Sequence, residues 1–489
     1  SDFMVGIRSY GGYIPRYRMN RMVIFGSMGW INPANMLNAR GEKAVANFDE
    51  DSLTMAVAAA VDCVDGFDRS ELGGVYFAST TAPYKERLNA NLAAGALGAG
   101  DAIRTADFAG GLKAGTTALL AAIDAVGAGN ANNIVVAVSD SRLGKMGSAQ
   151  ELMFGDGGAA FLVGDQDVIA EFKGSFSTGH DFVDHFRGAE TKFDRQWEDR
   201  WIRDMGFGKF IPEAVGGLCE KCGVKASDFA KIIYPCYYGR ARKNLNKKLG
   251  FEPEKVMDNL QEIVGDTGVA QSLVMLSKAL QESKAGDKLL VISYGSGCDA
   301  LYFEVTENIK NLAPRIGING YLANKAELDS YTKYLAWRGM IPLETGLRGE
   351  EDHWTRWSLV WRREKMILGM QGSKCKKCGT QQFPAQRVCV RPDCGALDDM
   401  ELVYLSGMGG KIFTYTSDML AASINPPAMY GTVDINGGGR FVFDYTDCVL
   451  DDLTVGKPVD FSFRMKFYDR KRDITNYFWK AVPVAEGVE

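Results

Sequence analysis

The feature that most constrains the fold is a repeated order of strand-like and helix-like segments. Residues 73–80 (GGVYFAST) and 132–141 (NNIVVAVSDS) are short β-branched apolar runs, and between them KAGTTALLAAIDAVGAG has helical spacing closed by glycines. This order predicts βαβ units and a largely parallel, buried sheet. We expect a further strand at residues 155–165, where GDGGAAFLVGD begins with glycines.

A second half of the chain returns to the same order. Residues 230–241 read as a strand and a loop, residues 267–283 as an Ala- and Leu-rich helix, and residues 287–306 as strand, glycine turn and strand. Two βαβ-rich halves in sequence indicate an internal duplication of element order. Between them lies a charged, Trp-bearing insertion at residues 180–208, which would either shape a pocket or line a dimer interface.

From about residue 350 the pattern changes to a Trp-rich helix, a cysteine pair and short alternating strands separated by Gly, Pro and Asp. Such strands are typical of a small all-β barrel. Four of the ten cysteines have metal-ligand spacing, in two close pairs on turns that contain Gly or Pro: Cys375, Cys378, Cys389 and Cys394. Two such turns bring four thiolates to one zinc ion, which would be structural because no coordination position stays open.

Alternatively, these four cysteines are reduced and carry no metal. Cys219 and Cys222 form a lone pair without a second pair, which indicates a helix end with incidental cysteines.

Composition excludes several classes of function. The 489 residues carry a net charge of −5, without the basic excess of a nucleic-acid-binding surface, although a local basic channel for a phosphorylated ligand is compatible with it. No run approaches the roughly 18 consecutive apolar residues of a membrane span, and the first residues lack the pattern of a secretion signal. We therefore expect a cytoplasmic protein with reduced thiols.

Several stretches together carry a family resemblance. LKAGTTAL, FGDGGAAFLVG, KFDRQWEDRWIRDMGF, GDTGVAQS and SYGSGCDALYFEV resemble hydroxymethylglutaryl-CoA synthases, especially the archaeal type, within the thiolase superfamily. The resemblance covers residues 4 to about 345. Residues 352–485 resemble the zinc-ribbon and OB-fold domains that accompany thiolase-superfamily enzymes, on the cysteine quartet, GKIFTYT, PPAMYGTVDINGGGRFVFDYTD and LTVGKPVDFSF.

The resemblance implies a duplicated, five-layered αβαβα fold, usually dimeric, with a CoA thioester bound in a tunnel between the halves. We expect thiolase-like halves at residues 1–165 and 166–350, a helix and zinc ribbon at 351–400, and an OB-type β-barrel at 401–489. In working members of the family an acyl group passes to a Cys thiolate, and a Glu, a His and an Asn assist the carbon–carbon condensation.

All four of these family positions differ in this chain. Leu112 occupies the place of the nucleophilic cysteine, and leucine cannot accept an acyl group. Thr80 falls at the general-base Glu, and a hydroxyl without a low pKa is no base at neutral pH. Pro235, or Tyr234 with a one-residue shift, falls at the histidine. The three histidines of the chain lie in other segments: His180, His185 and His353.

The family's Asn becomes Asp266, which would act as a base or as a helix cap ahead of Val269. The loop that replaces the histidine motif has polar side chains that would polarise a carbonyl and shuttle a proton, or would simply pack: Tyr234, Cys236, Tyr237 and Tyr238. Cys236 is also a displaced-nucleophile candidate, and the turn that contains Ser296 offers backbone N–H groups as an oxyanion site.

Four basic residues downstream of this loop are candidates for the CoA phosphates, or form a solvated helix face: Arg240, Arg242, Lys243 and Lys247. The sequence thus predicts an acyl-CoA-binding protein that forms or cleaves a carbon–carbon bond β to a thioester without a Cys acyl-enzyme, as an acyltransferase or lyase. The alternative is a catalytically silent subunit or CoA-delivering scaffold for an active thiolase. The partners expected are acyl-CoA and either a second copy of the chain or such a thiolase.

Overall fold

The computed structural model describes residues 4–485 and divides into two compact units. Unit 1 runs up to Ala46 and includes Asp51–Ala93 and Gly100–Tyr331. Unit 2 begins at Thr332 and also takes in two short segments from the N-terminal part of the chain, Asn47–Glu50 and Ala94–Ala99.

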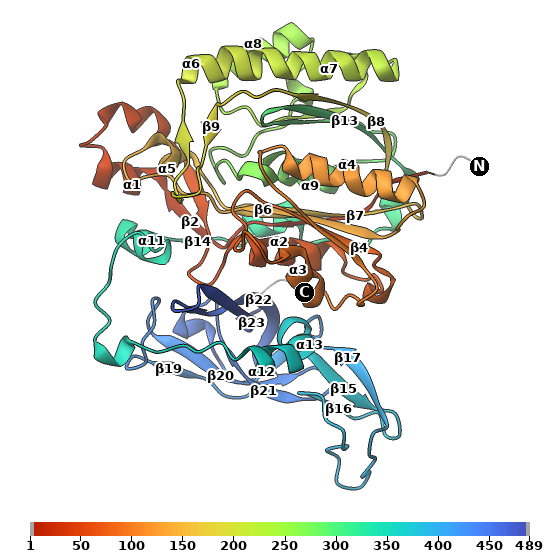
Figure 1. The fold of residues 1–489 in the computed structure, drawn as a ribbon, viewed down its shortest axis with the longest axis vertical. Helices are drawn as coiled ribbons and strands as arrows, with labels where there is room; N and C mark the ends of the chain where they lie inside the picture. Colours follow the sequence, from red (N-terminus) through yellow and green to blue (C-terminus); the bar gives the residue numbers. More distant parts are fainter. Residues whose placement is uncertain (1–3, 486–489) are drawn as a thin grey trace. The chain divides into compact units, whose positions relative to one another are not determined.

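A nine-stranded sheet organises unit 1, in the order β11-β12-β13-β8-β1-β7-β6-β4-β5. Its strands are β1 (Gly6–Tyr13), β4 (Gly74–Ala78), β5 (Arg104–Phe108), β6 (Ile134–Asp140), β7 (Gly157–Gly164), β8 (Ala170–Gly179), β11 (Lys231–Ile233), β12 (Lys288–Tyr294) and β13 (Gly297–Val305). Figure 1 shows the strands in two stacked layers, with β8 and β13 in one and β4, β6 and β7 in the other.

Helices α4 (Ala114–Gly127) and α9 (Gln271–Gln281) lie between the two layers, and their apolar residues join both layers in one core. A helix enclosed in this way must be apolar on nearly all sides, as the Ala- and Leu-rich sequences of both helices are. Helix α2 (Ser52–Cys63) covers one outer face, and α7 (Gly208–Cys222) and α8 (Gly239–Leu249) cover the other (Figure 1). The five-layered, thiolase-like αβαβα fold is therefore confirmed.

The expectation of a largely parallel sheet is wrong. Only β4–β5, β4–β6 and β11–β12 pair in parallel within this described sheet, and the other neighbours are antiparallel. The reason is connection length: β12 and β13 are joined by the two-residue turn Gly295–Ser296, and a parallel pair requires a crossover of a dozen or more residues.

The remaining elements of unit 1 are short. They are β2 (Tyr17–Asn20), β3 (Glu42–Val45), β9 (His185–Phe186), β10 (Arg195–Gln196), β14 (Ala326–Glu327), α1 (Arg21–Met28), α3 (Asn89–Ala96, which ends in unit 2), α5 (Ala149–Met153), α6 (Asp199–Trp201) and α10 (Gly317–Ala323). The insertion at residues 180–208 supplies the β9–β10 ribbon, α6 and a π-helical turn, Ile202–Phe207, that leads into α7.

Unit 2 contains a three-stranded sheet and a six-stranded antiparallel sheet. The first is formed by β15 (Gln371–Cys375), β16 (Gln381–Gln382) and β17 (Met400–Tyr404), after helices α11 (Tyr331–Trp337), α12 (Trp357–Arg362) and α13 (Glu364–Gly369). The second is formed by β18 (Gly410–Ile412), β19 (Thr416–Asp418), β20 (Ala428–Ile435), β21 (Arg440–Asp444), β22 (Pro458–Asp469) and β23 (Ile474–Pro483). A bridge between Tyr445 and Ala481 brings the end of β21 to β23, as in a small barrel.

The core of unit 2 includes a buried charged cluster around Asp49. Its carboxylate accepts from Arg464 Nη1 at 2.8 Å, Lys480 Nζ at 3.0 Å and Thr446 Oγ1 at 2.7 Å.

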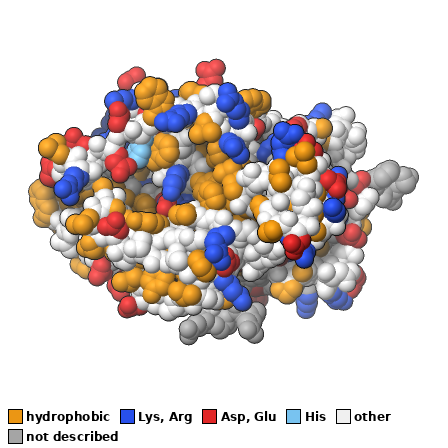
Figure 2. Space-filling model, turned by 90° about the horizontal axis from the view of Figure 1, so that it is seen from below, with side chains coloured by type: hydrophobic (Ala, Val, Ile, Leu, Met, Phe, Trp, Pro, Cys, Tyr) orange, Lys and Arg blue, Asp and Glu red, His pale blue; other side chains and the backbone are white. Residues whose placement is uncertain are grey.

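On the face shown in Figure 2, acidic and basic side chains are interspersed with apolar ones, and neither sign of charge forms a continuous patch.

Candidate functional site

The turn that precedes α4 carries Leu112 and is fixed by a buried carboxylate. Asp299, on β13, is 1% exposed and accepts from Lys113 Nζ at 3.0 Å and from Thr116 Oγ1 at 2.7 Å. These two bonds tie the first turn of α4 to the opposite half of the sheet. The scaffold that would present a nucleophile at residue 112 is thus intact, although its side chain is apolar.

The glycine turn between β12 and β13 lies directly against this scaffold. A Cβ at Gly295 would come within 2.7 Å of the backbone nitrogens of Leu112 and Lys113, so only glycine fits there. Ser296 has a left-handed φ of 51°, and its carbonyl accepts from the backbone N–H of His180 at 3.0 Å. Its side chain is exposed and does not line the cavities beside Leu112.

Two small cavities, of about 30 and 40 Å³, meet beside Leu112. We call them together the inner cavity. Both are lined by Leu112, Phe207, Tyr237, Asp266 and Tyr294. Since one water molecule needs roughly 10–15 Å³ of such space, the inner cavity has room for only a few water molecules. Its wall is mixed, with aromatic rings, hydroxyls and charged groups.

Of the predicted loop residues, Tyr237 is the tyrosine that lines both parts of the inner cavity. Tyr238 instead donates to Asp199 at 2.8 Å, and its ring lies 4.5 Å from that of Tyr237. Tyr234 is fully buried and donates to α8, at the carbonyl of Arg242 and the side chain of Asn246. The structure therefore separates the three tyrosines into one beside Leu112 and two that make other contacts.

Cys236 also contributes to the cavity wall but is buried, and burial raises the pKa of its thiol to about 11. A thiol with so high a pKa is a poor nucleophile at neutral pH.

Asp266 is held on both carboxylate oxygens. Oδ2 pairs with Arg142 Nη2 at 2.9 Å, and Oδ1 accepts from the backbone N–H of Gly268 at 2.9 Å. The N–H of Val269 donates to Asp140 instead, at 2.9 Å. Asp266 therefore caps the short turn at Gly268 and is bound by an arginine, which leaves it little capacity as a base.

Arg142 is a buried counter-ion to several carboxylates. Burial by itself would lower the pKa of Arg142, but Asp266, Asp194 and Asp140 outweigh it and raise the pKa above its ordinary value. The guanidinium also lies 3.9 Å from the centre of the Phe154 ring. The residue therefore stays charged and fixes one side of the inner cavity.

Thr80, at the place of the family's Glu, is fully engaged. Its hydroxyl donates to Asp140 Oδ2 at 2.8 Å and its backbone N–H to Asp140 Oδ1 at 2.7 Å. Asp140 is itself buried and accepts further bonds from Ser79 and Thr81. This network is a structural support and offers no free base.

The insertion brings groups to the inner cavity that sequence reasoning missed. Asp184, His185 and Asp194 line it together with Arg142. The only sequence signal for them was the adjacency of an acid and a histidine in a Trp-rich segment. His185 Nδ1 lies 3.1 Å from Asp184 Oδ1, which also accepts the backbone N–H of His185 at 2.7 Å. The inner cavity therefore contains a histidine, His185, which comes from the insertion and not from the loop where the family has its histidine.

A larger groove of about 800 Å³ lies over the same insertion. Its walls are mainly aromatic, with the rings of Trp197 and Trp201 stacked at 5.7 Å and those of His180 and Phe210 at 4.1 Å. Arg195 and Gln196 line both the groove and the inner cavity, so the two spaces share a wall. The insertion thus shapes a pocket, which is one of the two roles expected for it from the sequence.

The four predicted phosphate-binding residues lie on α8 with different surroundings. Arg242 stacks over the Tyr234 ring at 4.9 Å and donates to the Met257 carbonyl at 2.5 Å. Arg240, Lys243 and Lys247 are exposed and spaced to share one face of the helix.

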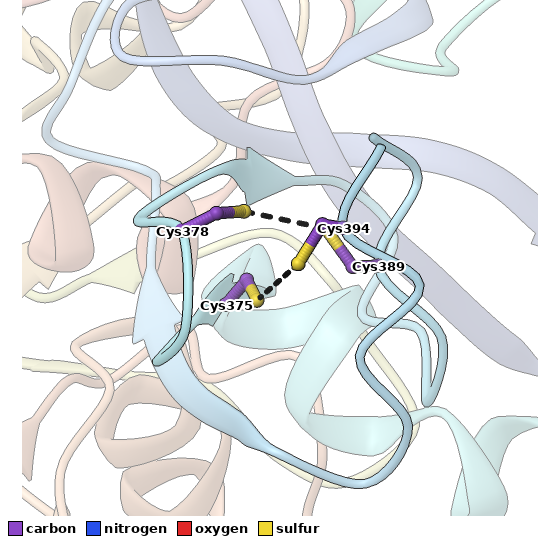
Figure 3. Close-up of side chains that lie close together, drawn as sticks. All are labelled: Cys375, Cys378, Cys389 and Cys394. Atoms are coloured by element: carbon purple, nitrogen blue, oxygen red, sulfur yellow. Dashed lines mark hydrogen bonds between the residues drawn. The ribbon is translucent and has the colours of Figure 1, made fainter. Parts of the chain in front are cut away.

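The four cysteines of unit 2 converge as predicted (Figure 3). The Cys375 and Cys394 sulfurs are 3.8 Å apart, those of Cys378 and Cys389 are 3.5 Å apart, and all four lie within 4.8 Å of one another. Tetrahedral coordination with Zn–S bonds of about 2.3 Å places sulfurs about 3.8 Å apart. The geometry fits one zinc ion bound by four thiolates, with a structural role.

Comparison with known proteins agrees with this geometry. Residues 219–302 match the model of the 3-oxoacyl-[acyl-carrier-protein] synthase III C-terminal domain, and residues 372–401 match the ChsH2 rubredoxin-like zinc ribbon. A crystal structure of HMG-CoA synthase complexed with CoA shares the fold, with a TM-score of 0.61 at 17% identity over 72% of this chain and 95% of that one. Fold and zinc site together define a thiolase-superfamily protein with a fused zinc ribbon.

Comparison with curated relatives identifies the family to which the chain belongs within this superfamily. The hydroxymethylglutaryl-CoA synthase of Methanopyrus kandleri is 33% identical over 316 residues, which are 63% of this chain and 89% of the relative. That of Pyrococcus furiosus is 32% identical over 64% of this chain and 90% of the relative. The chain belongs to the hydroxymethylglutaryl-CoA synthase family. Among the described residues, no helix is long and apolar enough to cross a membrane.

Proposed function

We propose that this protein binds an acyl-CoA and forms or cleaves the carbon–carbon bond β to the thioester carbonyl without an acyl-enzyme. The observation that carries the proposal is the polar wall of the inner cavity. Around an apolar Leu112, hydroxyls and charged side chains occupy the place where the acyl group would react. A site that had only lost its nucleophile would not need such groups.

The roles of this chain's residues follow from their positions. The Tyr237 hydroxyl would polarise the reacting carbonyl by donating a hydrogen bond to its oxygen. Because the Gly295 N–H already donates to the Gly297 carbonyl at 2.9 Å, the N–H groups of Ser296 and Leu112 would stabilise the developing oxyanion. Arg240, Lys243 and Lys247 would contact the CoA phosphates, and Arg242, which packs on Tyr234, would support the helix.

The relatives support CoA as the ligand class. The chain aligns with about nine-tenths of the length of two of them, and both are named hydroxymethylglutaryl-CoA synthase. Zinc would be held by the cysteine quartet and would stabilise the fold of the ribbon, with no part in the chemistry.

One observation favours the alternative, a silent subunit or CoA-delivering scaffold for an active thiolase. The inner cavity has room for only a few water molecules, and the polar side-chain atoms of Thr80 and Asp266 are already bonded to other residues. Co-purification of a second, Cys-bearing thiolase would distinguish this case.

The deciding experiment is exchange of the methyl protons of acetyl-CoA in D2O, followed by NMR. Exchange requires carbanion chemistry at the thioester but no second substrate. We expect exchange by the wild-type protein and a loss of about 10²-fold or more in Tyr237→Phe. Tyr302→Phe is the matched control, because the Tyr302 hydroxyl donates to Glu304, at 3.2 Å, on the same strand. Wild-type exchange that persists in Tyr237→Phe would refute the role of Tyr237.

A further inference from the structure

His185 is positioned by a ribbon that projects from the insertion into the site. It begins β9, which pairs with β10 in the register His185 to Gln196. His185 lines the inner cavity together with Leu112, Tyr237 and Tyr294. A side chain on a paired strand has a defined direction, so this placement does not depend on a free loop.

The contact with Asp184 determines which nitrogen of His185 bears the proton. Burial by itself would raise the pKa of Asp184, but the hydrogen bonds from His185, the charge that His185 carries when protonated and the nearby Tyr294 hydroxyl outweigh it and lower the pKa. Asp184 is therefore a carboxylate, which can only accept hydrogen bonds. Nδ1, 3.1 Å away, must then be the donor, and Nε2 of the neutral ring is left with its lone pair. Nε2 has no partner among the described residues.

A second polar group shares this cavity. Tyr294 is 5% exposed, and its hydroxyl lies near the Asp184 carboxylate but has no well-aligned hydrogen bond within the described chain. Its ring is stacked on Phe207 at 4.1 Å, which holds it in place. Burial and the nearby charge of Asp184 raise the pKa of Tyr294, so the hydroxyl stays protonated. A buried, unused donor costs free energy unless a ligand accepts from it.

We propose that His185 Nε2 and the Tyr294 hydroxyl are the acid–base pair of this site, acting on a β-hydroxyacyl-CoA. The inference rests on the proposed function and names its proton acceptor and substrate class. In the cleavage direction Nε2 takes the proton of the β-hydroxyl, and the bond between the α and β carbons breaks. The oxygen's electrons form a carbonyl, and those of the broken bond form the thioester enolate.

The Tyr294 hydroxyl donates a hydrogen bond to the enolate oxygen, and protonated His185 returns its proton to the α carbon. The products are a shorter acyl-CoA and an aldehyde or ketone, with no oxidant, reductant or water consumed. Condensation is the reverse of these steps. Asp184 is a positioning residue, because it fixes the tautomer and the ring without contacting substrate.

The test uses acetyl-CoA exchange in D2O with His185→Gln, and with His353→Gln as the matched control. His353 belongs to unit 2, where it lies beside Glu351 and is stacked on Phe467, and it is not among the residues that line the inner cavity. Exchange should fall about 10²–10⁴-fold in His185→Gln and stay within twofold of wild type in His353→Gln. Exchange that survives in His185→Gln overturns this inference and leaves the proposed function standing.

A second measurement separates the remaining outcomes. Carbethoxylation followed by mass spectrometry reports each of the three histidines, and bound acetyl-CoA should protect His185 at least fivefold. Protection without any exchange by the wild-type protein would overturn both the proposed function and the role of His185 as its base.

Nitrogen-15 NMR of histidine-labelled protein tests the tautomer directly. We expect the Nδ1–H form of His185 in the wild-type protein and a mixture of both forms in Asp184→Asn. The Nε2–H form in the wild-type protein would overturn the assignment.

Discussion

Tyr294→Phe should make the protein more stable, although tyrosine-to-phenylalanine changes at buried sites usually destabilise. A buried hydroxyl without a partner costs about 1–3 kcal/mol in desolvation, and the variant removes that cost. The stacking on Phe207 is kept, since only the oxygen is lost. With an unfolding entropy of about 2.1 cal/mol/K per residue over the roughly 300 residues of unit 1, the gain corresponds to about 2–5 °C in Tm.

Differential scanning calorimetry of wild type, Tyr294→Phe and Tyr302→Phe checks this prediction. Tyr302 is equally buried, on the adjacent strand of the same hairpin, but its hydroxyl donates to Glu304. Its loss should lower stability by about 0.5–1.5 kcal/mol, which is the opposite sign. If Tyr294→Phe loses as much stability as Tyr302→Phe, the hydroxyl has a partner in the free protein, and the reasoning that it awaits a ligand is refuted.

Three further predictions concern buried charge and metal. Asp49→Asn should lower the free energy of unfolding of unit 2 by about 3–5 kcal/mol at pH 7, because Arg464 and Lys480 lose their counter-ion. Although burial opposes it, these cations lower the pKa of Asp49 from 3.8 to about 2. The wild-type stabilisation should therefore be complete above about pH 4 and disappear as the pH falls toward 2, while Asp49→Asn lacks this dependence in urea titrations at pH 7, 4 and 2.5. Removal of zinc with a chelator, or Cys389→Ser, should release one zinc per chain, seen with a colorimetric dye, and abolish hydrogen-exchange protection in the ribbon but not in unit 1. Arg142→Met should cost about 3–5 kcal/mol in thermal unfolding by leaving buried carboxylates unpaired, and adding Asp266→Asn should recover part of that loss.

Local sequence patterns predicted the elements well. The strands expected at residues 73–80 and 132–141 are β4 and β6, and the glycine-closed helix between them is α4. Apolar runs bounded by glycines identify buried strands because few other structures accept them. Strand direction was predicted wrongly because it depends on how far the chain travels between strands, which the composition of a strand does not encode.

The sequence located the metal site but only part of the candidate active site. Cysteine spacing is a local property, and the four thiols converge as it indicated. Tyr237 was found because it replaces a family motif within one loop. His185 and Arg142 were missed because they reach the cavity from a ribbon and from the residues after β6, far from that loop in sequence. Whether a hydroxyl such as that of Tyr294 has a partner depends on three-dimensional contacts alone.

The state of the polar groups around Leu112 distinguishes decay from altered chemistry. Buried hydroxyls without partners are rare in folded proteins, because each one lowers the free energy of unfolding without a compensating contact. Among the described tyrosines, Tyr294 alone has a buried hydroxyl with no well-aligned hydrogen bond. It lines the same small cavity as His185, whose carboxylate partner leaves a lone pair available. A buried donor without a well-aligned partner costs stability, and a ligand that accepts from Tyr294 while offering a proton to His185 Nε2 is the simplest reason for a folded chain to keep it.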